Sequence, residues 1–119
     1  MTASERPADC LFCAMATGAM EVTKLVSRDD VFVIRDINPR APVHLLVIPT
    51  RHIPTAADVT DADGPVLAQM FQAAREAAVQ EGIGERGYRL AINVGSDAGM
   101  VIRHLHMHVL GGRRLAAEG

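Results

Sequence analysis

Three histidines occupy alternate positions near the C-terminus, in the segment His104-Leu105-His106-Met107-His108-Val109-Leu110. Side chains of a β-strand point alternately to opposite faces, so this pattern predicts a strand with one imidazole face and one apolar face. Neutral imidazole is a base, a nucleophile and a metal ligand near neutral pH. The imidazole face is therefore suited to bind a metal, or to divide proton transfer and nucleophilic attack at a phosphorus centre. A purification tag is contiguous and terminal, and this cluster is neither.

The bulk composition predicts one globular domain of ordinary size. The chain has 119 residues, of which 49% are hydrophobic, so it can bury one continuous core. Its formal net charge is -2 and it contains no basic run, which argues against a nucleic-acid backbone as the main partner. A single nucleotide needs only a local pocket, so it remains compatible with this charge.

The sequence shows no sign of a membrane span or an export signal. The longest apolar stretches are interrupted by Arg, Asp or Pro and are too short to cross a bilayer. Residues 1–9 lack the basic-then-apolar order of a signal peptide. We therefore expect a cytoplasmic protein without a membrane partner, with residues 1–9 as a flexible N-terminal tail.

The spacing of the apolar residues predicts five strands, one short helix and one long helix. Strands are expected at 23–27, 31–35, 43–49, 88–94 and 105–110, and helices at 11–17 and from 65 to about 81. Thr60 to Asp63 resembles a helix N-cap, and Gly18 and Gly82 are suited to end the two helices. Short connections favour antiparallel pairing, so the expected class is α+β with the long helix on one face of the sheet. The domain would span residues 10–112, followed by a C-terminal tail at 113–119.

Cys10 and Cys13 form a second candidate site, because C-x-x-C is a spacing at which two thiolates bind a metal. A redox pair, a disulfide and two unmetallated thiols are the alternatives. A thioredoxin-like pair would follow a strand, and none is expected before Cys10. A structural disulfide is disfavoured in a cytosolic protein. Zinc would need two further ligands, and His52 and His104 are feasible on composition.

A zinc ion at this position would change the role of the first triad histidine. If His104 binds the metal, it cannot also act as the nucleophile. The metal would then have four protein ligands and a structural role, rather than that of a Lewis acid in catalysis. It would attach the start of the triad strand to the N-terminal segment.

Together these motifs resemble the histidine triad (HIT) family of nucleotide-binding proteins, and within it the branch of small purine nucleoside phosphoramidases. The resemblance runs in order from about Cys10 to Gly112. Besides the triad, it rests on Cys10-Leu-Phe-Cys13, Asp36-Ile-Asn-Pro-Arg-Ala-Pro-Val-His44, Leu46-Val-Ile-Pro49, Arg51-His52-Ile53, Asn93-Val-Gly-Ser-Asp97 and Val109-Leu-Gly-Gly112. It implies the HIT-like fold, a five-stranded antiparallel sheet with helices, and a homodimer.

The resemblance also implies a reaction. His106 would attack the α-phosphorus of a purine nucleoside 5′-phosphoramidate, or of the corresponding acyl phosphate, and form a nucleotidyl-histidine. Water would then release the nucleoside monophosphate, AMP or GMP. His108 would contact the phosphate or the leaving group, and His44 would hold a neighbouring histidine in one tautomer. His44 is equally suited to be a purely structural histidine.

Residues for binding the nucleotide and the metal follow from the same resemblance. Asp36 would accept hydrogen bonds from the ribose hydroxyls, and Asn93 would lie near the phosphate or the ribose. The base would enter an apolar slot formed by Leu11, Phe12, Met15, Ile34 and Ile37. The phosphate would face backbone N–H groups of Gly99, Met100 and Val101. The zinc ligands of metal-bearing members match Cys10, Cys13, His52 and His104. Asp36 and Asn93 also suit an Asx-turn and a turn cap.

The chain departs from the phosphoramidase branch just before the triad. Gly99-Met100-Val101 stands where that branch commonly has Gly-Gln-Ser or Gly-Gln-Thr, and Met and Val cannot donate side-chain hydrogen bonds. Loss of one preorganised donor typically costs about 10²–10³ in rate. Arg103 carries positive charge, but strand alternation would point it away from the triad face. Two alternatives therefore stay open, a nucleotide-binding module with little turnover and a dinucleoside polyphosphate hydrolase, although the latter branch generally has a Gln at the triad and a longer chain.

Overall fold

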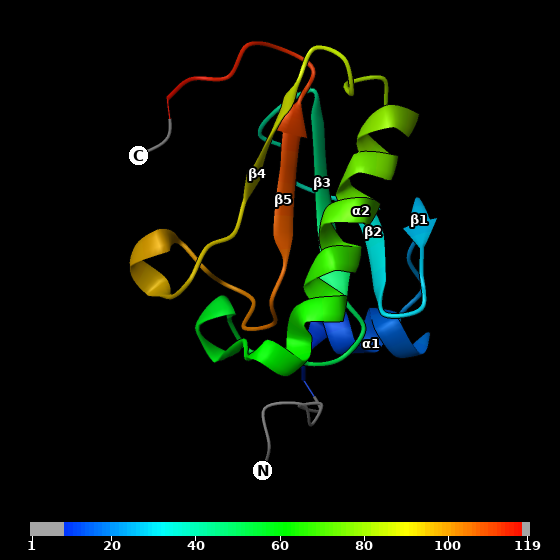
Figure 1. Cartoon of the computed structure of the whole chain (residues 1–119), viewed down its shortest axis with the longest axis vertical. Coiled ribbons are helices and arrows are strands. Elements are labelled where there is room, and N and C mark those ends of the chain that lie inside the picture. Colours follow the sequence, from blue (N-terminus) through cyan, green and yellow to red (C-terminus); the bar gives the residue numbers. More distant parts are fainter. Residues whose placement is uncertain (1–8, 118–119) are drawn as a thin grey trace.

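A five-stranded antiparallel sheet forms the centre of the molecule in the computed structural model, which describes residues 9–117 (Figure 1). The strand order is β1-β2-β3-β5-β4, so β3 and β5 are neighbours although more than fifty residues separate them in the chain. The strands are β1 Val26–Ser27, β2 Val31–Arg35, β3 Val43–Pro49, β4 Tyr88–Ala91 and β5 Met107–Gly111. The predicted α+β class and the antiparallel five-stranded sheet are confirmed.

The two predicted helices form at the expected places. Helix α1 spans Leu11–Thr17, and Gly18 ends it in the left-handed conformation at φ 84°. Helix α2 spans Gly64–Gln80. The predicted N-cap at Thr60 instead opens a short 3₁₀ turn, Asp61–Asp63, in which the Thr60 N–H donates to the Asp63 carboxylate. Two further 3₁₀ turns lie at Ala56–Asp58 and Ser96–Ala98.

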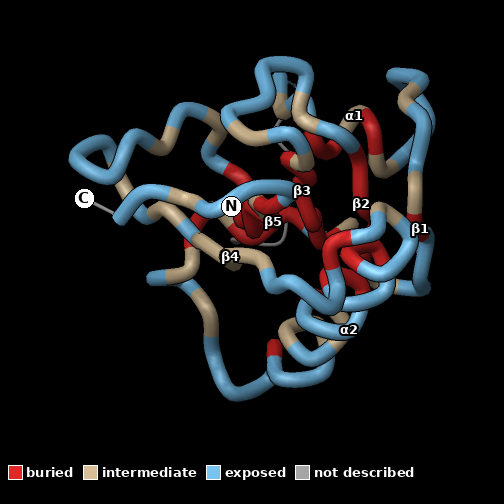
Figure 2. The backbone as a smooth tube through the Cα atoms, turned by 90° about the horizontal axis from the view of Figure 1, so that it is seen from above, coloured by how far each residue is buried: buried red, intermediate tan, exposed pale blue. Residues whose placement is uncertain are grey.

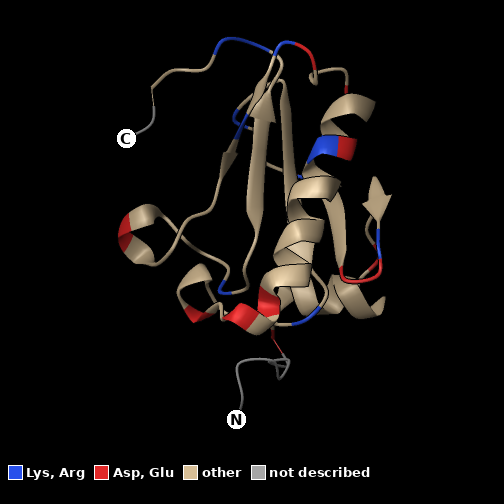
Figure 3. Cartoon of the chain, viewed as in Figure 1, with Lys and Arg blue, Asp and Glu red and all other residues tan. Residues whose placement is uncertain are grey.

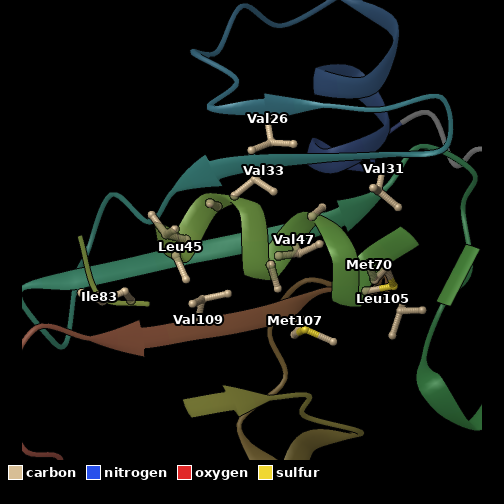
Figure 4. Close-up of a cluster of buried hydrophobic side chains, with 14 of the residues drawn as sticks. Val26, Val31, Val33, Leu45, Val47, Met70, Ile83, Leu105, Met107 and Val109 are labelled. Carbon is tan, nitrogen blue, oxygen red and sulfur yellow. The ribbon is translucent and has the colours of Figure 1, made fainter. Parts of the chain in front are cut away.

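Each helix covers a different face of the sheet. Helix α2 packs on the face that carries the larger apolar cluster, which includes Val33, Val47 and Val109 (Figure 4). Helix α1 supplies Phe12 and Met15 to a second cluster on the other face. Because both faces are covered, β2, β3 and β5 are buried along most of their length, as Figure 2 shows. The alternation of side chains therefore separates two buried environments rather than a core from solvent.

Strands β1, β4 and β5 are shorter than predicted. Strand β4 ends at Ala91 instead of residue 94 because its pairing with β5 covers only four positions. Strand β5 begins at Met107, so His104 and His106 precede it in an extended segment. That segment is held by a 2.6 Å hydrogen bond from the Leu105 N–H to the Ile53 carbonyl. Its alternation persists, because Leu105 joins the α2-side cluster while His104 and His106 contact Phe12.

The described part of the C-terminal tail lies against the domain. The Arg113 side chain donates to the Arg40 carbonyl at 3.2 Å, and the Arg89 side chain donates to the Ala116 carbonyl at 2.9 Å. Residues 1–8 of the expected N-terminal tail and residues 118–119 lie outside the described residues. Within residues 9–117, neither α-helix has the length and hydrophobicity that a bilayer span requires.

Candidate functional site

All five histidines of the chain are buried, and none exposes more than 9% of its surface. Their rings form an almost continuous series. His52 and His104 have ring centroids 4.9 Å apart, His106 and His108 5.2 Å apart, and His108 and His44 5.1 Å apart. The Phe12 ring meets both His104 and His106 edge-on, at 5.7 and 5.1 Å. The site is thus built on the α1 face of the sheet, with Phe12 packed against its middle.

One end of this series is a group able to hold a metal ion. Its members are Cys10, Cys13, His52 and His104, whose ligand atoms all lie within 4.8 Å of one another. Cys10 caps α1 and Cys13 lies in its first turn, while His52 follows β3 and His104 precedes β5. The fold therefore brings together all four residues that the sequence singled out as zinc ligands.

The spacing within this group suits a tetrahedral ion. The Cys10 Sγ and the Cys13 Sγ lie 3.3 and 3.6 Å from the His104 Nδ1. The Cys13 Sγ is 3.4 Å from the His52 Nδ1, and the two Nδ1 atoms are 3.1 Å apart. Tetrahedral zinc with ordinary bond lengths separates sulfur from nitrogen by about 3.5 Å and two nitrogens by about 3.3 Å. The donor set and its dimensions therefore fit this ion.

A hydrogen bond orients His104 for such a role. Its Nε2 lies 2.8 Å from the Pro49 carbonyl, an acceptor only, so the ring must place its proton on Nε2. The Nδ1 lone pair then faces the two cysteines and His52. Burial lowers the pKa of His104 to about 4, which keeps the ring neutral near pH 7. Neutral imidazole is the form that binds a metal.

The same argument determines which nitrogen of His106 is free. The His106 Nδ1 lies 2.7 Å from the His104 carbonyl, so Nδ1 carries the proton and donates it to that oxygen. The lone pair of a neutral ring is then on Nε2. An imidazole nitrogen with a lone pair is a nucleophile. His106 is therefore the triad histidine whose remaining lone pair, on Nε2, is not engaged by this hydrogen bond.

His44 and His108 form a hydrogen-bonded pair with a defined direction. The Arg40 backbone N–H donates to the His44 Nδ1 at 3.1 Å, so the neutral His44 ring carries its proton on Nε2. That proton is donated to the His108 Nδ1 at 2.8 Å, and the Asp36 Oδ2 lies 3.4 Å from the same Nε2. His108 consequently carries its own proton on Nε2 and can donate it. His44 lies on β3, as predicted for the strand at 43–49, but the direct pairing of this strand with β5 was not predicted from the sequence.

Asp36, His44 and His108 also lie close enough to be considered as metal ligands. The hydrogen bonds favour a different interpretation, because a ring that donates from Nε2 has no lone pair there for a metal. The 2.8 Å separation of the two imidazole nitrogens is typical of a direct hydrogen bond. In this trio the hydrogen bonds determine which nitrogen of each ring carries the proton, and they leave no lone pair on the His44 Nε2 to bind an ion.

Electrostatics keep the pair neutral. Burial, assisted by the charge effects of His106, His44 and Arg40 and opposed by Asp36, lowers the pKa of His108 to about 4. Burial also lowers the pKa of His44, with Asp36 opposing and Arg40 assisting. Both rings are thus neutral near pH 7, and His108 is a stronger acid when protonated than a free imidazole.

These shifts predict that the protein loses stability on acidification. The pKa of His108 is about 4 in the folded protein and about 6.5 in the unfolded chain, so the unfolded chain binds more protons between these values. The free energy of unfolding should therefore fall by about 3 kcal/mol as the pH drops from 6.5 to 4, at about 1.4 kcal/mol per pKa unit. Urea unfolding across this range measures the effect. The variant His108→Gln should show a shallower decline, and an unchanged decline would contradict the assignment.

The residues expected to bind the base are only partly assembled in the single chain. Phe12, Met15 and Ile34 are buried within the α1-side cluster, while Leu11 is 40% exposed. Ile37 is 92% exposed, so in the single chain it does not form a wall of a closed slot. Asn93 is half-buried just beyond the end of β4. Asp36 accepts from the Asn38 N–H at 2.8 Å, so it makes the Asx-turn and also faces His44.

The segment before the triad offers fewer backbone donors than expected. The Gly99 N–H donates to the Ser96 carbonyl and the Met100 N–H to the Gly95 carbonyl, so two of the three expected phosphate donors are used within the turn. The Val101 N–H has no backbone acceptor among residues 9–117, and its side chain is 91% exposed. Arg40, within the segment from Asp36 to His44, also reaches the site, and no sequence pattern singled it out. Its side-chain Nη2 lies 3.4 Å from the His108 Nδ1.

The chain is similar in sequence and fold to known proteins of one family. The HIT domain model matches residues 18–115. The purine nucleoside phosphoramidase of Escherichia coli K12 is 47% identical over 92 residues, which cover 76% of this chain and 77% of that protein. A HIT family hydrolase from Legionella pneumophila superposes with a TM-score of 0.87 at 44% identity, covering 91% of this chain and 96% of the other. A zinc-bound histidine triad family protein from Mycobacterium smegmatis gives a TM-score of 0.74 at 30% identity, covering 88% and 76%.

Proposed function

Because the chain belongs to the HIT domain family, we propose that it hydrolyses purine nucleoside 5′-phosphoramidates, or the corresponding acyl phosphates, to nucleoside monophosphates. The observation that carries the proposal is that the Nε2 atoms of His106 and His108 differ in protonation. His106 has a free lone pair on Nε2, and His108 has a donor N–H on Nε2. One ring is thus prepared to attack phosphorus while the other can protonate the leaving group.

The proposed reaction has two steps. In the first, the His106 Nε2 forms a bond to the α-phosphorus and the phosphorus–nitrogen bond breaks. The leaving nitrogen takes the Nε2 proton of His108, which binding of the substrate anion first converts to the imidazolium, so the His108 ring ends this step neutral. The positive charge that develops on His106 is stabilised by the His104 carbonyl, which accepts its Nδ1–H. In the second step, the now unprotonated His108 Nε2 takes a proton from water, the water oxygen bonds to phosphorus, and the bond to His106 breaks. The products are an amine, AMP or GMP, and the starting enzyme.

Nucleotide binding is assigned to the remaining residues. Asp36 would accept from the ribose, since its carboxylate borders the His44–His108 pair. The base would lie beside Leu11 and Phe12, with exposed Ile37 covering it on binding. Asn93 would contact the phosphate or the ribose. Few donors remain near Gly99, Met100 and Val101, so we expect a slower reaction than a full donor set would support.

We further propose that Cys10, Cys13, His52 and His104 hold a structural zinc ion. When bound, the metal would act as a cross-link between α1, the segment after β3 and the start of the triad segment. It would have no open position, and no chemical step would pass through it. The His104 carbonyl orients the nucleophile, so holding His104 would also steady His106.

A homodimer is proposed as the working assembly. Strand β4 lies at one edge of the sheet, the kind of position at which a second copy of the chain can pack. Helix α2 leaves 54% of Phe71 and 66% of Val79 exposed, apolar surface that a second copy would cover. Sedimentation of the full chain distinguishes a dimer from a monomer.

The proposed activity is tested by incubating the wild-type protein with adenosine 5′-phosphoramidate and measuring release of AMP. Turnover of this substrate supports the proposal. AMP binding without turnover would instead indicate a nucleotide-binding module, which the engaged Gly99 and Met100 amides would help to explain. Faster cleavage of a dinucleoside polyphosphate would assign the protein to that class of hydrolase.

Replacing His44 should reveal its role as a positioning residue. His44→Ala removes the donor to the His108 Nδ1, so His108 can place its proton on the wrong nitrogen. We expect kcat to fall about 10–100-fold with little change in KM. His44→Gln keeps an N–H donor and should recover part of the loss. Measurement of kcat and KM against pH tests this, and equal losses in both variants would contradict it.

A further inference from the structure

We propose that the guanidinium of Arg40 binds an anionic oxygen of the substrate beside His108, a phosphate or carboxylate oxygen, and supplies the charge that Met100 and Val101 cannot. This inference rests on the proposed function, since it assigns an anion subsite to the same active site. Arg40 lies in the loop that joins β2 to β3. Its Nη2 is 3.4 Å from the His108 Nδ1, so the side chain already reaches the edge of the histidine cluster.

The backbone of Arg40 is held at two points. Its N–H donates to the His44 Nδ1 at 3.1 Å, and its carbonyl accepts from the Arg113 side chain at 3.2 Å. These contacts link the loop to the site on one side and to the C-terminal tail on the other. Several Lys and Arg positions lie at this end of the sheet, where β3 begins and β5 ends (Figure 3). The guanidinium therefore extends from a defined position rather than from an unattached loop.

The charge of Arg40 is not neutralised within the described chain. Arg28, Arg35 and Arg51 form ion pairs with Glu76, Glu81 and Asp63. Arg40 instead approaches a neutral imidazole whose Nδ1 already accepts from His44. A guanidinium has five N–H donors in a planar fork that matches the oxygens of a phosphate or carboxylate. An anion is therefore the ligand that would satisfy this side chain.

The position of the charge points to the His108 end of the site. The positive charge of Arg40 contributes to the lowered pKa values of His44 and His108, whereas the effects on His104 come from burial, Pro49, His52 and His106. Arg40 thus lies at the opposite end of the histidine series from the metal-binding group. The proposed proton donor to the leaving group is His108. An anion held here would be either the α-phosphate or an acidic group on the leaving amine.

Few hydrogen-bond donors for a phosphate remain in residues 99–101, so a positive charge from Arg40 would compensate for them. Met100 and Val101 have no side-chain donors, and the Gly99 and Met100 amides are used within their own turn. Charge-assisted hydrogen bonds to phosphate or carboxylate are about twice as strong as neutral ones. A single arginine from the β2–β3 loop can therefore compensate for a missing neutral donor.

The experiment compares Arg40→Gln and Arg40→Lys with wild type and with Arg35→Gln as a matched control. Arg35 ends β2 and pairs with Glu81, outside the histidine cluster. Both Arg40 variants keep the backbone N–H to His44, so they change the side chain without removing that hydrogen bond. Calorimetry measures AMP binding, and kcat/KM is measured for two adenosine 5′-phosphoramidates, one with a neutral amine and one with a carboxylate-bearing amino acid.

We expect Arg40→Gln to lower either the affinity for AMP or the kcat/KM for the carboxylate-bearing substrate by about 10-fold or more. Arg40→Lys should recover part of this loss, and Arg35→Gln should match wild type. Weaker binding of AMP assigns the α-phosphate as the anion. Unchanged AMP binding with a loss only for the carboxylate-bearing substrate assigns the leaving group. Values within twofold of wild type for AMP and both substrates would overturn the inference. If the wild-type protein turns over neither substrate, the proposed function fails, while AMP binding still tests Arg40.

Discussion

Replacing His106 by Asn is expected to lower kcat/KM for adenosine 5′-phosphoramidate by at least about 10⁴-fold, while AMP binding stays within a few fold of wild type. The Asn side chain keeps an N–H that can donate to the His104 carbonyl, as the His106 Nδ1 does at 2.7 Å. It lacks the lone pair that the structure leaves on the His106 Nε2. The variant thus separates the chemistry of the nucleophile from its structural hydrogen bond.

Rapid mixing of wild type with excess substrate should show a burst of amine release if the second step is slower than the first. Mass spectrometry of protein quenched during turnover should find one nucleotidyl group on His106 and none in His106→Asn. His104, His108 and His44 provide no such adduct in this mechanism, because their lone pairs or protons are already used. Equal turnover in wild type and His106→Asn would exclude His106 as the nucleophile.

Loss of the proposed zinc ion is expected to lower the melting temperature by about 10 °C or more, since a structural site couples metal binding to folding. The ion would join four buried or half-buried side chains that come from three separate segments. Elemental analysis of untagged protein should find about one zinc atom per chain. Fully folded protein without metal would contradict the proposal.

Two cysteine variants sharpen this test. Cys10 caps α1 by accepting from the Cys13 N–H at 3.4 Å, and serine is a good N-cap residue. Cys10→Ser therefore preserves the cap while removing a thiolate ligand, so a fall in melting temperature and zinc content cannot be ascribed to the helix end. Cys13→Ser should behave similarly. Glu21→Gln, on the exposed chain after α1, is the matched control and should retain the metal.

The helices and the faces of the strands could be predicted from the sequence because they depend on nearby residues. Gly18 ends α1 by adopting a left-handed conformation, and the spacing of apolar residues defines α2. The alternation of histidines with Leu105, Met107 and Val109 correctly assigned two faces, although β5 begins only at Met107. Both sides of the segment 104–106 are buried, so its side chains alternate between two packed environments although it does not yet pair with β3.

The ends of the strands could not be predicted, because they depend on partners far away in the chain. Residues 92–94 continue the alternation of β4, but only positions 88–91 have a partner on β5. The adjacency of β3 and β5 also follows from packing. It places His44 within hydrogen-bonding distance of His108, although 64 residues separate them. Arg40 and its contact with His108 were missed for the same reason.

The sequence by itself determined that the three imidazoles would lie on one side of the triad segment and that the two thiols would lie one helical turn apart, because side-chain alternation and helix periodicity are local properties of the chain. Only the tertiary structure decided what each histidine can do. A neutral imidazole has a single N–H, and its acceptor determines which nitrogen keeps the lone pair. Those acceptors are the Pro49 carbonyl for His104 and the His104 carbonyl for His106, and packing of distant segments puts the first of them in place.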